Sequence, residues 1–338
     1  MTISVNVSSA RYDIVLESGA LSNVANLFNL NRKVCIVTDD GAPQNYATEV
    51  ANASQQPYIF TFKSGEMSKS LETYQELCKF LLLNHFSRYD CIVAVGGGVV
   101  GDFAGFAAST YMRGIDFYNV PTTLLSQLDS SIGGKVAVNF SGIKNILGAF
   151  YHPKKVLIDP SVLNTLPKRQ FASGMAEAIK VGMTSDRALF ELIETEPIEQ
   201  NLLEIIRRAL CVKKDIVEQD EKETGLRRIL NFGHTIGHGI ESVSGLYHGE
   251  CVALGMLPMC ADSVKERLIA VLEKVGLPTS VTAESNLVCQ AITHDKKAQG
   301  TGIRAVNVNE IGTYNVADIS FKEISEKVSQ IVTGGECK

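Results

Sequence analysis

The sequence predicts an α/β N-terminal domain with a Rossmann-like parallel sheet, followed by a mostly α-helical domain. Up to about residue 160, short apolar runs typical of buried strands alternate with segments whose apolar residues recur at helical spacing. Strands separated by single helices form parallel sheets with helical cover. After Pro160 the strand-like runs largely disappear and helical periodicity dominates. We therefore expect two domains, at residues 1–160 and 161–338.

The individual elements follow from these runs. The segments expected to form strands in the first domain are Ser4–Val7, Ile14–Leu16, Lys33–Thr38, Tyr58–Phe62 and Asp90–Val95. The segments there with helical spacing are Ser70–Phe86 and Phe103–Tyr111. In the second domain, residues 164–167 (Asn-Thr-Leu-Pro) resemble a helix start, Leu202–Val217 has a helical pattern, and Ile303–Val308 favours a short strand.

The composition is that of a globular protein. Hydrophobic residues make up 45% of the chain and charged residues 20%, so a sizeable core can form. A net charge of −5 gives no indication of binding to nucleic acid or an anionic membrane. The N-terminus lacks the pattern of a signal peptide, and the longest apolar run, Cys91–Gly101, is too short to span a bilayer. The eight cysteines form no Cys-x-x-Cys pair, which favours reduced thiols and a cytoplasmic location.

A glycine turn follows the strand-like run that ends at Val95. Residues Gly96–Asp102 fit the pattern G-x-G-x-x-G and open a helical stretch. Such glycines let the backbone approach a pyrophosphate, and the helix N-terminus supplies unpaired N–H groups. The pattern favours a dinucleotide site, with a tight turn that binds nothing as the alternative. Asp39 is the best candidate for the ribose-binding acid, although an aspartate in a turn before Gly41 explains it equally well.

Three of the six histidines lie within fifteen residues of one another. His234 and His238 have i, i+4 spacing and share a face if the segment is helical, and His248 follows. This clustering favours a metal site over histidines of the core. The His-x-x-x-His spacing lacks the glutamate of a protease-type zinc motif. Glu177 is an isolated charge in a small, apolar segment, so it is either a fourth candidate ligand or a paired or exposed carboxylate.

Several basic or amide residues stand beside glycines and small residues. Such positions suit close approach to a phosphate, although each residue singly could be solvated surface. Asp129 could orient a hydroxyl group or cap a turn. The basic and amide residues are Arg113, Lys135, Lys144, Asn145, Lys180, Lys213 and Arg227.

Together these segments resemble the 3-dehydroquinate synthase family of sugar phosphate cyclases. The matching motifs run from residue 64 to residue 297 in the order and spacing of that family. Two departures, Ile143 where the family usually has Gly and Val181 where Tyr is common, concern loop detail. The matching motifs are Ser64–Glu66 with Lys69, Gly96–Asp102, Arg113-Gly114, Val120–Leu125, Asp129–Lys135, Lys144-Asn145, Gly174–Lys180, Asp220-Glu221, Arg227, Leu230–His238, His248–Glu250 and Asp295–Lys297.

The resemblance implies an N-terminal NAD-binding domain, a helical metal-binding domain and an active site between them. It implies that Glu177, His234 and His248 bind one divalent metal ion, zinc or cobalt, and it assigns His238 to the substrate phosphate. It also implies a homodimer, because Arg113 resembles an arginine that reaches a phosphate across the interface. The implied NAD contacts are Asp39, Glu66, Lys69, Gly97, Gly98, Asp102, Thr122, Thr123, Lys135, Lys144 and Thr165. The implied substrate contacts are Arg113, Asp129, Lys135, Asn145, Lys180, Lys213, Arg227, Asn231, His238 and one of Lys296 and Lys297.

The implied reaction converts 3-deoxy-D-arabino-heptulosonate 7-phosphate to 3-dehydroquinate and phosphate, a step of the shikimate pathway to aromatic amino acids. It proceeds by transient oxidation with NAD, phosphate elimination, re-reduction and intramolecular aldol closure. A cyclase of the 2-deoxy-scyllo-inosose synthase type would share the cofactors but would not need a carboxylate clamp, for which Lys213 and Arg227 argue. Against a metal-dependent polyol dehydrogenase stands the phosphate-binding set of Lys135, Asn145 and His238. An inactive scaffold protein would have little reason to carry the full set of site residues.

Overall fold

Seven strands form one sheet in the first of two compact units, into which the chain divides between Leu166 and Pro167. The computed structural model describes residues 1–296 and 302–333. The strand order is β1-β2-β9-β6-β5-β3-β4, in which β1 and β2 are antiparallel and the other pairs are parallel. The strands are β1 (Thr2–Asn6), β2 (Arg11–Leu16), β3 (Lys33–Asp39), β4 (Gln56–Phe62), β5 (Cys91–Gly96), β6 (Asp116–Pro121) and β9 (Lys155–Ile158).

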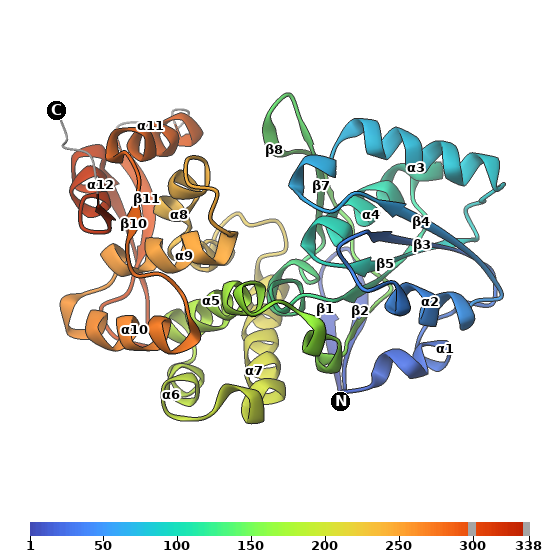
Figure 1. The fold of residues 1–338 in the computed structure, drawn as a ribbon, viewed down its shortest axis with the longest axis horizontal. Coiled ribbons are helices and arrows are strands. Elements are labelled where there is room, and N and C mark those ends of the chain that lie inside the picture. The colour runs from blue at the N-terminus through green and yellow to red at the C-terminus, as the bar shows by residue number, and fades with distance from the viewer. Residues whose placement is uncertain (297–301, 334–338) are drawn as a thin grey trace. The chain divides into compact units, whose positions relative to one another are not determined.

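Helices cover both faces of this sheet (Figure 1). Val34 and Ile36 of β3 join a buried cluster with residues of α1 and α2, whereas Cys35 and Val37 join a second cluster with residues of α3 and α4. Successive side chains of a strand point to opposite faces, so a strand covered on both sides needs apolar residues throughout. The helices are α1 (Val24–Leu27), α2 (Gln44–Asn52), α3 (Leu71–Leu83) and α4 (Gly98–Thr110).

An antiparallel hairpin, β7 (Lys135–Phe140) and β8 (Ile143–Phe150), follows outside the main sheet. Ser141 and Gly142 form its turn, both with positive φ. Large apolar side chains on β8, those of Ile143, Ile146 and Phe150, are exposed. The short helical turns of this unit are Ala20–Asn23, Glu66–Ser68, Tyr111–Arg113, Ser126–Ser130 and Pro160–Thr165.

The second unit is mostly helical (Figure 1). Its strands are short and pair in two separate two-stranded sheets, β10 with β13 and β11 with β12. The elements are α5 (Lys168–Thr184), α6 (Arg187–Thr195), α7 (Ile198–Gln219), the turn Leu226–Asn231, α8 (His234–Glu241), α9 (His248–Met256), the turn Leu257–Met259, α10 (Asp262–Val275), β10 (Val281–Thr282), α11 (Ser285–Lys296), β11 (Gly302–Asn307), β12 (Asn315–Ser320), α12 (Phe321–Val328) and β13 (Val332–Thr333).

Glycines allow α5, α8 and α9 to pack with their backbones in contact. A Cβ atom added at Gly249 of α9 would lie 1.8 Å from the carbonyl oxygen of Ser173 on α5. One added at Gly255, also on α9, would lie 2.0 Å from the carbonyl oxygen of Gly233, which precedes α8. No side chain fits at such distances, so these two positions fix the spacing of the three helices.

Most predicted elements are present, with shifted ends. The five predicted strands of the first unit correspond to β1 to β5, and Ile303–Val308 corresponds to β11. The predicted helix at Phe103–Tyr111 begins earlier, at Gly98, because the glycines form the helix start rather than a loop before it. The hairpin β7–β8 was not predicted. None of the described helices is long and apolar enough to cross a membrane.

Candidate active site

Three helices of the second unit bring one carboxylate and two imidazoles together. Oε1 of Glu177 on α5 lies 3.8 Å from Nε2 of His234 at the start of α8 and 3.7 Å from Nε2 of His248 at the start of α9. Ligand atoms about 2.1 Å from a tetrahedral zinc ion lie roughly 3.4 Å apart, so this trio has nearly the spacing of a metal site.

The Glu177 carboxylate supports that interpretation. Its side chain is 3% exposed, and one oxygen pairs with the amine of Lys180, one turn further along α5. The other oxygen, Oε1, is buried and accepts no hydrogen bond. A buried carboxylate oxygen without a donor is costly unless a bound ion or water satisfies it. Because it faces two imidazole nitrogens, a divalent metal ion fits these residues.

The two imidazoles differ in their electrostatics. Burial lowers the pKa of His234 well below its ordinary value, and the positive charges of Lys180, His248 and His238 lower it further. His234 is therefore neutral at pH 7, the form that binds metals. Burial acts in the same direction on His248, but the hydrogen bond to Glu241 and the charge of Glu177 outweigh it and raise the pKa. A metal ion thus competes with a proton at His248.

His238 lies beside these residues but outside the trio that contains Glu177. Its ring centroid is 5.3 Å from that of His234 and 5.9 Å from that of His248, and its side chain is exposed. It belongs instead to a second group of potential ligands, together with Glu241 and His248. The i, i+4 spacing does place His234 and His238 on one face of α8, as the sequence predicted.

Three basic residues of the same unit are almost fully buried. Lys180, Lys213 and Arg227 are 2%, 4% and 3% exposed. They lie on α5, α7 and the turn Leu226–Asn231, and these three elements pack against one another. Burying charged groups is expensive unless they are paired or bind an anion. Lys180 pairs with Glu177, and the three residues together place positive charge on elements that pack against one another, which suits an anionic ligand nearby.

Asp220 holds the turn that carries Arg227. Its carboxylate accepts hydrogen bonds from the backbone N–H groups of Thr224, Gly225 and Arg227 at 2.8–2.9 Å. Burial alone would raise the pKa of Asp220, but these donors lower it to about 2. The Arg227 guanidinium donates to the carbonyl oxygen of Glu221 at 2.7 Å. Arg227 is thus held at both its backbone and its side chain.

The remaining candidates of this unit are less constrained. Asn231 is exposed and donates to Oε1 of Glu223 at 2.9 Å. Lys296 is the last residue of α11, and Lys297 lies outside the described residues.

In the first unit, the glycine turn joins β5 directly to α4. Gly97 caps α4 in an extended conformation, and Gly98 is its first residue. A Cβ at Gly97 would lie 3.1 Å from Cγ2 of Thr123, and one at Gly98 would lie 3.0 Å from Oγ of Ser130. Thr123 and Ser130 thus pack closely against the two glycines and leave little room for a larger residue at this helix N-terminus. The N–H groups of a helix N-terminus suit a pyrophosphate.

Asp39 ends β3, the strand next to β5 in the sheet. Its carboxylate accepts from the backbone N–H groups of Gly41 and Ala42, at 3.1 and 2.9 Å, while burial raises its pKa. The position, at the carboxyl end of a neighbouring strand, is that of a ribose-binding acid in a Rossmann-like sheet. The same carboxylate closes the turn that follows β3, through its hydrogen bonds to Gly41 and Ala42.

Three of the other predicted NAD contacts, Glu66, Lys69 and Asp102, form a cluster of charges, and the remaining ones lie apart from it. Asp102 of α4 pairs with the buried Lys69 at 2.7 Å, and Glu66 lies 3.7 Å from the same amine. Burial raises the pKa of Asp102, and Lys69 opposes this shift. Thr122 and Thr123 follow β6, Thr165 contacts the hydroxyl of Tyr46 at 2.9 Å, and Lys144 is exposed on β8.

The substrate candidates of the first unit lie in and around the hairpin. Lys135 begins β7, Asp129 lies in the turn Ser126–Ser130, and Arg113 is exposed with φ 68°. Asn145 of β8 has φ 57°, and its N–H donates to Oδ1 of Asn139 at 2.8 Å. These left-handed conformations are uncommon outside glycine and often mark functional positions.

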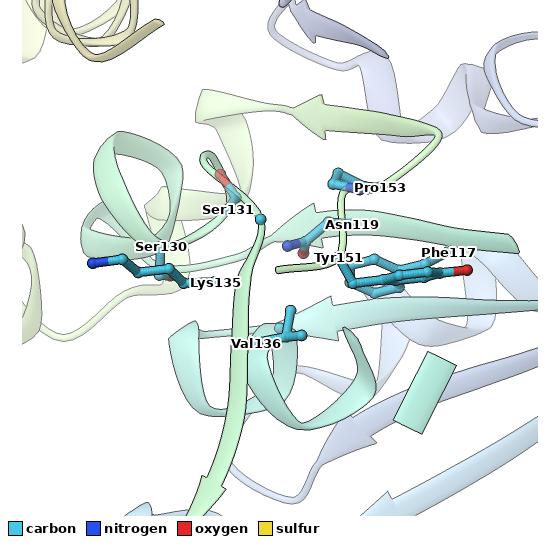
Figure 2. A pocket seen from close by; sticks show the side chains of 10 residues that line it. Phe117, Asn119, Ser130, Ser131, Lys135, Val136, Tyr151 and Pro153 are labelled. Carbon is cyan, nitrogen blue, oxygen red and sulfur yellow. The ribbon is translucent and has the colours of Figure 1, made fainter. Parts of the chain in front are cut away.

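A small cavity lies beneath this region (Figure 2). Asn119, Ser131 and the rings of Phe117 and Tyr151 surround it, with Lys135 at its edge. Its volume, about 10 Å³, is enough for roughly one water molecule. The Ser131 hydroxyl is buried and has no hydrogen-bond partner. The cavity thus suits a bound water rather than a substrate.

Sequence reasoning missed Glu241. It ends α8, seven residues after His234, and its Oε2 lies 3.1 Å from Nδ1 of His248. The i+3 spacing from His238 and the i+7 spacing from His234 would have placed it on the histidine face of the helix.

Solved structures define the class to which this fold belongs. A 2-deoxy-scyllo-inosose synthase, complexed with carbaglucose-6-phosphate, NAD⁺ and Co²⁺, is 25% identical with a TM-score of 0.88, covering 98% of this chain and 100% of its own. A 2-epi-5-epi-valiolone synthase from Streptomyces hygroscopicus, with NAD⁺ and Zn²⁺ bound, is 26% identical with a TM-score of 0.86, covering 96% and 98%. A probable glycerol dehydrogenase, 16% identical at a TM-score of 0.60, shares only the fold. The fold is that of the sugar phosphate cyclases.

Sequence comparisons narrow the class. The family models for the N-terminal and C-terminal parts of 3-dehydroquinate synthase match residues 59–173 and 174–298. The 3-dehydroquinate synthases of Streptococcus gordonii and Lactococcus lactis are 42% and 39% identical, each covering 96% of this chain and 99% of the relative. The chain belongs to the 3-dehydroquinate synthase family. The predicted fold class, family and enzymatic function are confirmed, and the predicted NAD and divalent metal agree with the ligands named for the two cyclase structures.

Proposed function

We propose that this enzyme converts 3-deoxy-D-arabino-heptulosonate 7-phosphate to 3-dehydroquinate and phosphate, using NAD and one divalent metal ion. The observation that carries the proposal is the convergence of Glu177, His234 and His248 around a buried carboxylate oxygen that accepts no hydrogen bond. The match to relatives of this name over 96% of the chain supports the choice of substrate.

Glu177, His234 and His248 would hold the metal ion. When bound, the metal ion would supply a Lewis acid for a substrate hydroxyl, and NAD would supply reversible hydride transfer. Lys180 neutralises one oxygen of Glu177 and so keeps the other directed at the two imidazoles. Because Lys180 and Glu177 are both buried, water is excluded from this ion pair, which strengthens the attraction between the two charges.

His238, Lys135 and Asn145 would bind the phosphate and stabilise the charge that develops as it leaves. Arg113 would reach a phosphate across the interface of the proposed homodimer. Positively charged and amide donors serve this purpose because phosphate offers several acceptor oxygens. Asp129 and Asn231 would orient hydroxyl groups of the substrate.

Lys213 and Arg227 would bind the substrate carboxylate. Both side chains are almost fully buried, and a guanidinium can meet a carboxylate through two parallel hydrogen bonds. The rigid attachment of Arg227, through Asp220 and Glu221, would fix the orientation of that fork.

The first unit would serve as the NAD-binding domain and the second as the metal- and substrate-binding domain. The Gly97-Gly98 turn would receive the pyrophosphate at the N-terminus of α4. The other predicted NAD contacts, with Asp39 on the ribose, would complete the site.

Two further proposals concern the setting of the enzyme. The exposed apolar side chains of Ile143, Ile146 and Phe150 on β8 support a homodimer, since they would be buried in a subunit interface. Seven cysteines of the described part of the chain form no disulfide, which suits the reducing conditions of the cytoplasm.

The test is turnover of the heptulosonate phosphate by purified protein supplied with NAD and Zn²⁺ or Co²⁺. We expect many phosphates released per NAD and no accumulation of NADH. Absence of phosphate release would contradict the proposal, and NADH produced in step with substrate would indicate a polyol dehydrogenase. Glucose 6-phosphate, which lacks the carboxylate, serves as the matched control; equal turnover of it would favour the 2-deoxy-scyllo-inosose synthase type.

A further inference from the structure

Both imidazoles of the metal trio are held at the nitrogen that does not face Glu177. Nδ1 of His234 lies 3.2 Å from the carbonyl oxygen of Phe232, and Nδ1 of His248 lies 3.1 Å from Oε2 of Glu241. The Nε2 atoms of both rings face Oε1 of Glu177. Each ring therefore has one nitrogen directed at the proposed metal position and the other at an acceptor.

These two acceptors differ in strength and origin. Phe232 offers a neutral backbone oxygen two residues before His234, so that contact is local. Glu241 offers a carboxylate from the end of α8 to a ring at the start of α9. The side chains of Glu241 and His248 are 19% and 29% exposed, so the contact is partly shielded from water.

We propose that Glu241 is a positioning residue that fixes His248 for metal binding. The inference rests on the proposed function insofar as Glu177, His234 and His248 hold the metal. The Nδ1–H of His248 donates to the Glu241 carboxylate, which leaves the Nε2 lone pair for the metal and locks the ring orientation. A carboxylate behind a metal-binding histidine also makes its other nitrogen a better ligand.

The packing of α8 and α9 adds to this argument. The N-terminal residue of α8 is a proposed ligand, His234, and its C-terminal residue is Glu241. Residues 242–247 then return the chain to His248, at the start of α9. The contact between Glu241 and His248 thus joins the two ends of the segment 242–247, and one of these ends is the proposed ligand His248. A change in the conformation of this segment would therefore change the affinity for the metal ion.

A second role for Glu241 must be distinguished. Glu241, His238 and His248 also form a group that could hold a metal ion, in which Glu241 would be a direct ligand. The contact at Nδ1 argues against that role. A metal-binding imidazole uses one nitrogen for the metal, and here the other nitrogen, Nε2, faces the deeply buried Glu177.

The experiment compares the metal affinity of the full-length Glu241→Ala and Glu241→Gln variants with that of the wild type. Zn²⁺ affinity is measured by competition with a chelator, and Co²⁺-loaded protein gives a visible spectrum that reports ligand geometry. We expect Glu241→Ala to bind Zn²⁺ about 10- to 100-fold more weakly, with an altered Co²⁺ spectrum. Glu241→Gln keeps an oxygen acceptor and should recover the affinity to within about threefold.

The control is Glu191→Ala on α6, which removes an exposed carboxylate paired with Arg187 on the same helix. It should leave metal affinity unchanged. The melting temperature of the metal-free proteins shows whether Glu241→Ala acts on folding instead; we expect a change of only a few degrees. Unchanged metal affinity in Glu241→Ala would overturn the inference. So would complete metal loss in both Glu241 variants, because a direct ligand would behave in that way.

Failure of the proposed function is a separate result. Wild-type protein that binds Zn²⁺ with the Glu241 dependence but releases no phosphate from the heptulosonate phosphate would contradict only the proposed reaction. Wild-type protein that binds no Zn²⁺ or Co²⁺ would overturn the Glu241 inference as well.

Discussion

Replacement of Gly249 by alanine should disrupt the metal site without touching any ligand. The added Cβ would lie 1.8 Å from the carbonyl oxygen of Ser173, and such atoms are not found closer than 3.0 Å. The helices α5 and α9 must therefore separate by about 1.2 Å at this point, next to His248. If His248 moves by that amount from Glu177, their distance of 3.7 Å grows to about 5 Å, too far for two ligands of one ion.

The substitution Gly249→Ala should affect folding stability and Zn²⁺ affinity to different extents. Overpacking of this kind typically costs about 1–3 kcal/mol of folding stability, and the better helix propensity of alanine returns up to about 1 kcal/mol. The loss of one ligand should weaken Zn²⁺ binding more than 100-fold, beyond the usual effect of a supporting residue. The two quantities are measured by urea unfolding of metal-free protein and by chelator competition.

Gly182→Ala is the matched control. Gly182 lies on α5, the helix that Gly249 of α9 contacts, but its added Cβ would meet the backbone of Phe190 on α6, at 2.9 Å. We expect some loss of stability in this variant with wild-type metal affinity. The reasoning is refuted if Gly249→Ala binds Zn²⁺ as tightly as wild type, or if Gly182→Ala weakens binding to the same extent.

The other predictions concern the ligand set, the carboxylate and acid stability. His248→Ala should lose bound metal whereas His238→Ala should keep it and bind phosphate poorly; metal analysis of both proteins showing the reverse would exchange their roles. Arg227→Ala and Lys213→Ala should each lower kcat/KM about 30- to several-thousand-fold, because removing one partner of a buried charged contact costs about 2–5 kcal/mol; near-wild-type values in steady-state assays would exclude the carboxylate role. The pKa of Asp220 is about 2 in the folded protein, below about 3.9 in an unfolded chain, so its carboxylate stabilises the fold above about pH 4 and this contribution is lost as the pH falls toward 2. Urea unfolding should therefore show a stability gap between wild type and Asp220→Asn that narrows from pH 6 to pH 3, and a constant gap would contradict the assignment.

The strands and long helices could be predicted from the sequence because their signals are local. The run Lys33–Thr38 matches β3 to within one residue, and its continuous apolar character reflects burial on both faces. The start of α4 was placed too late, since three successive glycines resemble a loop. The hairpin β7–β8 was missed, although the Ser141-Gly142 turn is a recognisable signal.

The site was less accessible because it depends on contacts between distant segments. The spacing of His234 and His238 indicates a shared helix face, but it does not reveal that α5 brings Glu177 to the same point. That approach depends on Gly249, whose lack of a side chain allows backbone contact with Ser173. The family resemblance supplied what spacing alone could not. Which predicted residues contact NAD and substrate stays a prediction.

The burial of certain lysines has a practical consequence for following the two units separately. Lys69 in the first unit and Lys180 and Lys213 in the second are at most 4% exposed, whereas the side chain of a surface lysine such as Lys154 is 60% exposed. Amine-reactive reagents modify only lysines that solvent can reach. Lys69 should therefore be labelled only when the first unit opens, and Lys180 and Lys213 only when the second does. Peptide mass spectrometry after timed acylation would read these three amines as internal reporters, one for the first unit and two for the second.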